Sequence, residues 1–277
     1  MAASEIRDFS RLAIHTMTNK PWSLAECIAG YSKAGVPGLS VWRNVVQAAG
    51  VKEAARMLRG SGLQVVSLVR GGFFPAREAA GRVKALDENR RAVDETAAVG
   101  APLLVLVCGS VPGLPLAEAR GQIAEGIAGL LPHAAAARVK LAIEPLHPMY
   151  AADRSAVVTM RQAREICERL RSEWLGMAVD VYHVWWDAEL EAEIRSAGSA
   201  GLLAAFHLCD WRVETRDLLN DRGLMGEGCI DLRAIRGWME EAGFRGWREV
   251  EVFSTERWKQ DQSAYVEEIK QAYLRHA

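Results

Sequence analysis

The chain has 277 residues, of which 50% are apolar and 25% are charged, and its formal net charge is −1. This length is enough for one large α/β barrel or for two ordinary domains. The balanced charge argues against a nucleic-acid-binding protein, because such proteins usually carry a basic excess or a basic stripe.

Cysteine spacing and the N-terminal residues indicate where the protein resides. The chain has five cysteines: Cys27, Cys108, Cys167, Cys209 and Cys229. They are widely spaced and include no C-x-x-C pair, so neither a disulfide framework nor a zinc ribbon is expected. The start, "MAASEIRDFS", lacks the apolar core of a signal peptide, and no run approaches the roughly 18 apolar residues of a membrane span. We expect a cytoplasmic protein with no membrane partner.

Strand-like and helix-like segments alternate along the whole chain. Short runs rich in Val, Leu and Ile predict strands at residues 12–17, 38–42, 63–69, 102–109, 140–145, 176–183, 202–210 and 248–254. Helical spacing predicts helices at about 23–34, 51–59, 76–99, 117–138, 155–171, 187–197, 231–242 and 262–275. This pattern predicts a single (β/α)₈ TIM barrel domain over residues 1–277. The alternative is an open doubly wound sheet, but the G-x-G-x-x-G turn typical of that fold is missing.

Ionisable residues occur near the ends of the last four predicted strands. Glu144 ends the fifth strand, Asp180 lies in the sixth, His207 in the seventh, and Glu249 and Glu251 in the eighth. Since alternate residues of a strand share a face, all of them are expected to face the barrel axis. Glu251 is nearer the rim at which TIM barrels carry their chemistry, whereas Glu249 is expected to lie deeper and to pair with an Arg or Lys.

Three carboxylates that converge beside one imidazole in a confined cleft would repel one another unless a cation neutralised them. An oxygen-rich set with one nitrogen suits Mn²⁺, Mg²⁺ or Co²⁺ better than a structural zinc. Each residue alone has an ordinary alternative role, such as a helix cap or a satisfied core histidine. In register on successive strands, the four predict one divalent-metal site, with Mn²⁺ as the first choice: Glu144, Asp180, His207 and Glu251.

Five segments carry a resemblance to a known family. The segments are, in chain order, "AIEPL", "VDVYHVWWD", "HLCDWR", "GEGCIDL" and "VEVFS". They resemble the sugar phosphate isomerase/epimerase family with the xylose-isomerase-like TIM barrel, which includes ketose 3-epimerases and inosose isomerases and dehydratases. The resemblance covers nearly the whole chain and is specific for the superfamily, not for the substrate.

The resemblance implies roles for individual residues. It assigns the metal to the four residues above, and it implies that Glu144 and Glu251 act as an acid/base pair on opposite faces of a bound sugar. It also implies that His183 contacts the substrate. Members of the family often form dimers or tetramers, so the resemblance makes this chain a candidate homo-oligomer.

The chain departs from the ketohexose epimerases at two positions. Tyr150 stands where those enzymes have a further Glu, and Val213 stands where they have an Arg. His147, three residues after Glu144, is a candidate base for an elimination reaction. The alternative for His147 is a loop histidine that stacks on its neighbouring prolines.

Four more residues are candidates for substrate contacts at the barrel mouth. His15 ends the first strand, Trp42 ends the second, Trp186 follows the sixth, and Arg212 follows the seventh. Aromatic rings can stack on a sugar, and an arginine can donate hydrogen bonds to its oxygens. The alternatives are packing for the aromatic residues and a surface ion pair for Arg212.

We therefore predict a metal-dependent isomerase or epimerase of a sugar, keto-sugar or cyclitol that removes a proton next to a carbonyl. The alternative is a metal-dependent lyase or dehydratase with His147 as the base. An abasic-site endonuclease would need several metals and more ligands than the six histidines of the chain supply. A non-enzymatic sugar-binding barrel is disfavoured by the intact ligand set. The expected partner is a small carbohydrate, with no nucleic acid.

Overall fold

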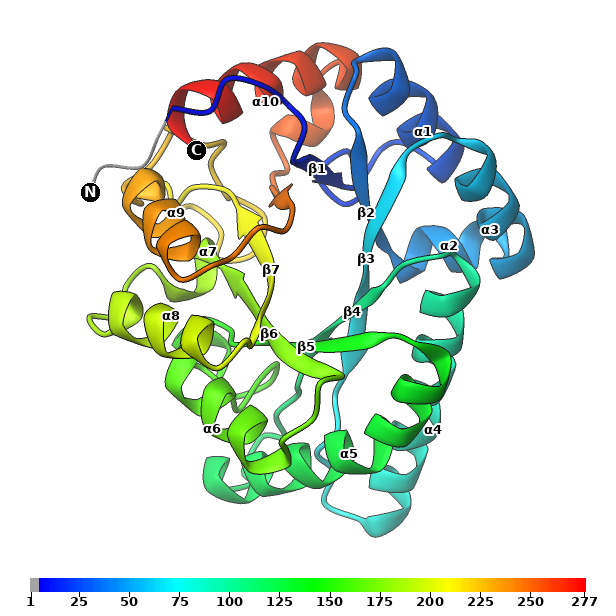
Figure 1. The fold of residues 1–277 in the computed structure, drawn as a ribbon, viewed down its shortest axis with the longest axis vertical. Coiled ribbons are helices and arrows are strands. Elements are labelled where there is room, and N and C mark those ends of the chain that lie inside the picture. Colours follow the sequence, from blue (N-terminus) through cyan, green and yellow to red (C-terminus); the bar gives the residue numbers. More distant parts are fainter. Residues whose placement is uncertain (1–4) are drawn as a thin grey trace.

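The computed structural model describes residues 5–277 as a closed barrel of eight parallel strands that follow one another in chain order (Figure 1). The strands are β1 (Leu12–His15), β2 (Gly38–Trp42), β3 (Gln64–Gly72), β4 (Leu103–Val107), β5 (Lys140–Glu144), β6 (Leu175–Asp180), β7 (Leu203–Leu208) and β8 (Arg248–Val250). β1 pairs with both β2 and β8, which closes the barrel. The predicted (β/α)₈ fold is confirmed.

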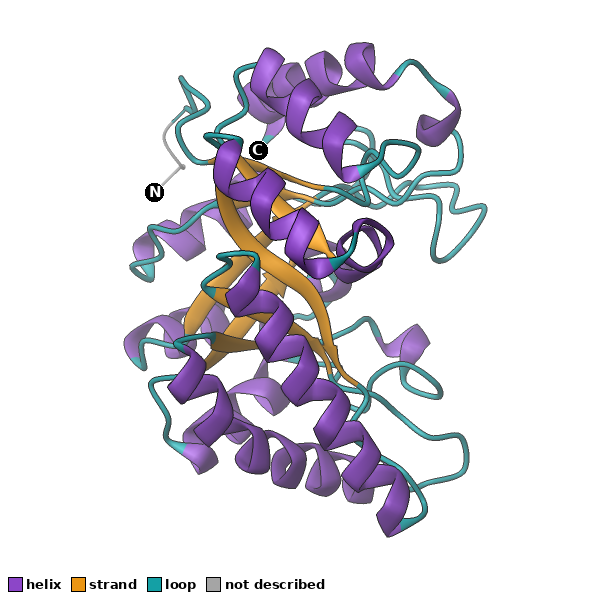
Figure 2. Cartoon of the chain, turned by 90° about the vertical axis from the view of Figure 1, so that its right-hand side faces the viewer, coloured by secondary structure: helices purple, strands orange, loops and turns teal. Residues whose placement is uncertain are grey.

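Helices surround the barrel on its outside, as the side view in Figure 2 shows. They are α1 (Leu24–Lys33), α2 (Arg43–Ala49), α3 (Val51–Gly60), α4 (Ala79–Ala98), α5 (Leu116–Ala137), α6 (Met160–Leu170), α7 (Val181–Val184), α8 (Leu190–Ser199), α9 (Leu232–Glu241) and α10 (Gln262–His276). Two 3₁₀ turns, Pro148–Tyr150 and Arg257–Lys259, follow β5 and β8. Within residues 5–277, no helix has the length and apolar character that crossing a membrane requires.

Capping residues explain where several helices begin. The Ser23 side chain accepts a hydrogen bond from the backbone NH of Glu26, and the Glu26 carboxylate accepts one from the backbone NH of Ser23, which forms a capping box before α1. Asp261 accepts from the NH of Ala264 and so begins α10. These polar residues satisfy NH groups that the first turn of a helix leaves without partners.

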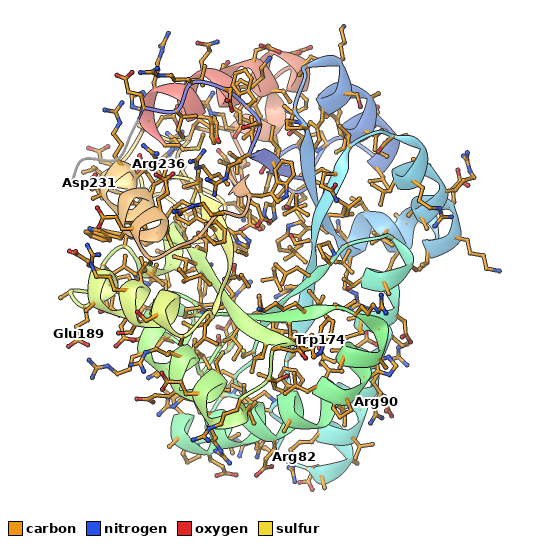
Figure 3. The ribbon with its side chains drawn as sticks, in the orientation of Figure 1. Arg82, Arg90, Trp174, Glu189, Asp231 and Arg236 are labelled. Atoms are coloured by element: carbon orange, nitrogen blue, oxygen red, sulfur yellow. The ribbon has the colours of Figure 1, made fainter. Side chains whose placement is uncertain are left out.

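Alternation along the strands separates an inner from an outer core. Ala142, Ala178 and Ala205 pack with Val105 and other residues inside the barrel. Alternate residues of these strands, and Val250 of β8, belong to the larger cluster between the strands and the helices: Leu141, Ile143, Met177, Val179, Phe206 and Val250. The predicted facing of these strands is confirmed. In Figure 3, side chains fill the middle of the barrel, whereas the exposed residues Arg90 and Glu189 lie on the outer helices.

Several predicted boundaries are wrong near the rim. The sixth strand ends at Asp180, not at residue 183, because the Asp180 carboxylate accepts from the NH of Tyr182 and caps the short helix α7. The eighth strand ends at Val250, so Glu251 lies just beyond it. The third strand extends to Gly72, and helix α2 was not predicted.

Candidate active site

The predicted ligands from three neighbouring strands lie close together at the rim. Glu144, Asp180 and His207 are buried, and each offers a ligand atom within 4.8 Å of those of the other two. The Nδ1 atom of His207 lies 3.0 Å from Glu144 Oε1. Register explains this closeness, since Asp180 on β6 is paired directly with His207 on β7.

Glu251 joins this group through His207 but stands closer to β1. His15, His207 and Glu251 form a second group whose ligand atoms also lie within 4.8 Å of one another. The Nδ1 atom of His15 lies 2.9 Å from Glu251 Oε1. His15, proposed from the sequence as a substrate contact, is fully buried and faces Glu251 and Glu249. His15 therefore orients the carboxylates of Glu249 and Glu251.

Glu249 has different partners from those predicted. Its Oε2 atom accepts hydrogen bonds from Ser40 Oγ at 2.6 Å and from Ser67 Oγ at 2.9 Å. The Nε2 atoms of His15 and His207 lie 3.5 and 3.7 Å from the same oxygen. The expected Arg or Lys partner is wrong, because two hydroxyls and two imidazoles already surround this carboxylate. Glu249 thus supports the site from below.

Arg222, which the sequence analysis did not single out, is the cation closest to the predicted ligands. It lies in the long loop between β7 and α9, and its Nη1 atom donates to Asp180 Oδ2 and to Glu251 Oε2, both at 2.9 Å. The guanidinium group is buried between the rings of Tyr182 and Phe253, at 4.4 and 4.8 Å from their centroids. Each carboxylate oxygen has two acceptor sites, so Arg222 and a metal can share one.

Burial and charge shift the pKa values of these groups in opposite directions. Burial lowers the pKa of His207, but the charges of Glu249, Glu144 and Glu251 outweigh it and raise the pKa to about 10. Burial raises the pKa of Glu144. The pKa of Glu251 is held well below its usual value despite burial, because His15 and Arg222 carry positive charge beside it. Without a metal, the protonated His207 and Arg222 therefore offset the charge of the carboxylates.

The donor set fits a divalent cation. Both ring nitrogens of His207 are buried and make no hydrogen bond within residues 5–277, although carboxylate oxygens lie nearby. A buried nitrogen in that state usually has a partner, and a metal ion is one that carboxylates and an imidazole can share. Glu144, Asp180, His207 and Glu251 would hold it through three carboxylates and one nitrogen.

A cavity of about 200 Å³ opens beside this cluster. It is lined by Trp42, Arg70, Val107, Glu144, Leu146, Tyr150, Arg154, His183, Leu219, Arg222, Glu251 and Phe253. Its small volume suits a ligand of a few carbon atoms. His183 lines it as predicted, and burial lowers the pKa of this imidazole to about 3, so the ring is neutral. Trp42, also considered from the sequence, lines the cavity as well.

Three other predicted residues do not line this cavity. The ring of His147 stacks on Trp211, with centroids 5.1 Å apart, and its Nδ1 atom accepts from the NH of Met149. Trp186 packs edge-on against His147 and donates to the His183 carbonyl at 2.8 Å. Arg212 forms an ion pair with Glu227 at 3.1 Å. None of these three residues belongs to the lining of the cavity.

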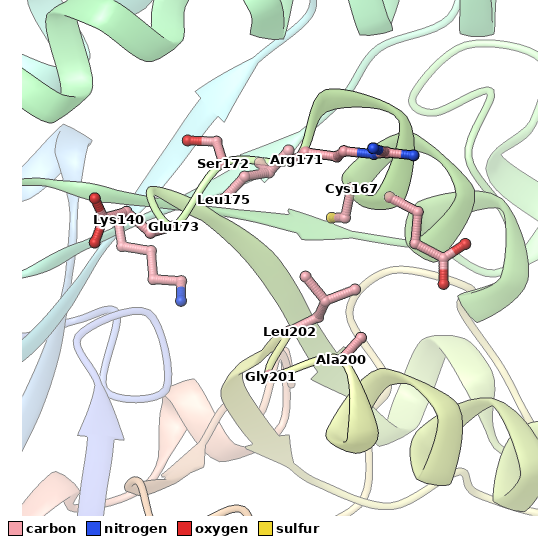
Figure 4. Close-up of a pocket in the computed structure, with 10 residues that line it drawn as sticks. Lys140, Cys167, Arg171, Ser172, Glu173, Leu175, Ala200, Gly201 and Leu202 are labelled. Carbon is pink, nitrogen blue, oxygen red and sulfur yellow. The ribbon is translucent and has the colours of Figure 1, made fainter.

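A larger hollow lies at the opposite end of the strands. It has a volume of about 750 Å³ and is lined by residues at the starts of β5 and β6 and at the end of α6, among them Lys140, Cys167 and Leu175 (Figure 4). It contains none of the predicted ligands. TIM barrels carry their chemistry at the carboxyl ends of the strands, so the smaller cavity is the candidate active site.

Three arginines of the cavity were missed by sequence reasoning. Arg70 lies in β3, one residue beyond the predicted end of that strand, and it follows Val69, which faces the inside of the barrel. Arg154 and Arg222 come from loops after β5 and β7, where no spacing rule places a side chain.

Comparison with known proteins gives the family. Residues 29–275 match the sequence model of the xylose isomerase-like TIM barrel family, so the chain belongs to this family. No curated protein matches the chain.

Solved structures share the fold over nearly the whole chain. Protein SMc04130 from Sinorhizobium meliloti 1021 is 48% identical, with a TM-score of 0.93, over 96% of this chain and 98% of that one. The IOLI protein with a bound zinc atom is 20% identical, with a TM-score of 0.83, over 95% and 96% of the two chains. A D-psicose 3-epimerase, solved with D-fructose, is 16% identical, with a TM-score of 0.76, over 95% and 96%.

Proposed function

We propose that the protein is a divalent-metal-dependent isomerase or epimerase of a small sugar, keto-sugar or cyclitol. The observation that carries this proposal is that Glu144 and Glu251, from strands on different sides of the barrel mouth, line one cavity beside His207. Two carboxylates that face one bound molecule can remove a proton from one carbon and return it on the other face. Fold relatives named as a D-psicose 3-epimerase and an L-ribulose 3-epimerase support this class of reaction.

The surrounding residues hold the carboxylates ready for this step. His15 and Arg222 fix the two oxygens of Glu251, and Glu144 lies beside His207. When bound, the metal, with Mn²⁺ as first choice and Mg²⁺ or Co²⁺ as alternatives, polarises the carbonyl and stabilises the negative charge that proton removal creates. Trp42 and Phe253 line the cavity and cover the reacting atoms from water.

The alternative reaction, elimination with His147 as the base, has less structural support. The His147 ring packs against Trp186 and Trp211, and His147 does not line the cavity. A base must reach the proton that it removes, directly or through one water. The lyase or dehydratase reaction therefore ranks second, and the substrate in either case is a small carbohydrate.

Deuterium exchange tests the proposal. The Mn²⁺-loaded protein, incubated in D₂O with a panel of ketoses and inososes, should incorporate deuterium at the carbon next to the carbonyl, as NMR can follow. Glu144→Gln and Glu251→Gln should abolish exchange, whereas Glu165→Gln on the exposed face of α6 should not. Metal content measured in parallel separates loss of the metal from loss of proton transfer. Exchange that survives in both cavity variants, or product formation without any exchange, would overturn the proposal.

A further inference from the structure

The cavity carries more positive charge than its own carboxylates require. Three arginines line it: Arg70, Arg154 and Arg222. Arg222 is ion-paired with Asp180 and Glu251. Neither Arg70 nor Arg154 forms a hydrogen bond or an ion pair through its side chain with any residue of the described chain, 5–277; each only lies over an aromatic ring, Phe73 and Tyr150 respectively.

A β-bulge turns Arg70 toward the cavity. In the pairing of β3 with β4, Val69 is opposite Val105 and Gly71 is opposite Leu106, so Arg70 is an extra residue without a partner. Val69 belongs to the inner core of the barrel, so simple alternation would direct Arg70 outward. Bulges commonly redirect a side chain next to an active site. A bulge that brings a charged, half-buried side chain into the cavity indicates a ligand contact.

The charges of the cavity residues indicate the sign of the charge that the ligand carries. Burial lowers the pKa of Arg70 and the nearby Arg154 lowers it further, so the two guanidinium groups repel each other, whereas the charges of Glu144 and Glu251 raise it. With a divalent cation bound, Arg222 and the metal balance Glu144, Asp180 and Glu251. Arg70 and Arg154 would then remain uncompensated in a partly desolvated cavity, which an anionic group of the ligand would relieve.

We propose that the substrate is a small carbohydrate with an anionic terminus, a carboxylate or a phosphate, which Arg70 and Arg154 bind together while its carbonyl end faces the metal ligands. This inference rests on the proposed function and narrows its substrate class. Arginine suits the role because its planar fork pairs with carboxylate and phosphate oxygens through two parallel hydrogen bonds.

Matched ligands test the proposal. Binding of D-fructose, D-fructuronate and D-fructose 6-phosphate to the Mn²⁺-loaded protein is measured by calorimetry at low salt; these compounds differ only at carbon 6. We expect one or both anions to bind at least about tenfold more tightly than D-fructose. A preference for fructuronate identifies a sugar acid, and a preference for the phosphate identifies a sugar phosphate. Equal affinity for all three compounds would overturn the proposal.

Variants show whether the two arginines cause the preference. Arg70→Gln and Arg154→Gln should each reduce it about tenfold, and Arg70→Lys, which keeps the charge, should retain part of it. Arg169→Gln is the matched control, because Arg169 is exposed at the end of α6, away from the cavity. A preference that both Gln variants keep would come from the metal and would overturn the proposal.

The test also separates this inference from the proposed function. If D-fructose exchanges deuterium while neither anion binds more tightly, the substrate class is wrong and the isomerase remains. If an anion binds through Arg70 and Arg154 but no ketose or keto-acid exchanges deuterium, the anion site remains and the isomerase is wrong.

Discussion

Removal of Arg222 should make the stability of the protein depend on the metal. Its guanidinium group is buried and donates to Asp180 and Glu251 at 2.9 Å, so Arg222→Met leaves two buried carboxylates without their cation. Breaking a buried ion pair on one side costs about 3–5 kcal/mol. The lost contacts with the rings of Tyr182 and Phe253 act in the same direction. We expect the free energy of unfolding to fall by about 3–5 kcal/mol in a chelator.

Mn²⁺ should restore much of this loss. A divalent cation held by Asp180 and Glu251 supplies the missing positive charge, so the variant should gain more stability from Mn²⁺ than the wild type does. For scale, a ligand at a hundred times its Kd stabilises the folded state by about 2.7 kcal/mol. Urea denaturation with chelator and with MnCl₂ measures both quantities. A variant that folds only with Mn²⁺ would be the extreme form of the expected result.

The control and the refuting results are specific. Arg169→Met also removes one arginine, but from an exposed position, and should change the unfolding free energy by no more than about 0.5 kcal/mol. A loss of less than about 1 kcal/mol for Arg222→Met in chelator would show that Arg222 does not neutralise the carboxylates. An equal loss with and without Mn²⁺ would show that the metal does not bind at these carboxylates.

Three further predictions test the site. Glu144→Gln and His207→Ala should abolish bound Mn²⁺ in elemental analysis while circular dichroism stays unchanged, and unaltered metal content would refute the ligand assignment. In the metal-free protein the pKa of His207 is raised from 6.5 to about 10, so its contribution to stability is complete below pH 6.5 and is lost as the pH rises toward 10. The unfolding free energy should therefore fall over this window in the wild type and less so in His207→Ala; parallel profiles would contradict a charged imidazole. His147→Asn should keep deuterium exchange within about twofold of wild type, and a loss of a hundredfold would favour His147 as a general base.

The fold and the closeness of the proposed ligands could be predicted from the sequence because both follow from strand periodicity. Apolar runs mark the strands, and alternation places Glu144, Asp180 and His207 on the inner face at the end where parallel strands meet. The same rule identified Glu251, although the strand ends one residue before it, because its NH still donates to Leu208 and continues the ladder.

The rest of the site could not be predicted because other physical causes place it. Hydropathy alone predicts that the sixth strand continues to residue 183. The strand ends at Asp180 instead, because this residue caps the helix that follows. Arg70 faces the cavity only through a bulge, which reverses the direction that alternation assigns. Arg222 reaches Asp180 from a loop, and the two residues are 42 positions apart in the chain. No local pattern encodes such a contact.

The strands and the loops supply different parts of the chemistry of the site. The strands supply the groups that any metal-dependent proton transfer at this rim needs: carboxylates, an imidazole and a common register. The bulge and the loops supply three arginines: Arg222 pairs with Asp180 and Glu251, and Arg70 and Arg154 are the two that we propose bind the anionic end of the ligand. Two relatives with the same four ligands can therefore share a reaction while their arginines select different substrates. For this chain, the charge of the ligand's far end is accordingly a sharper guide to its substrate than the metal ligands are.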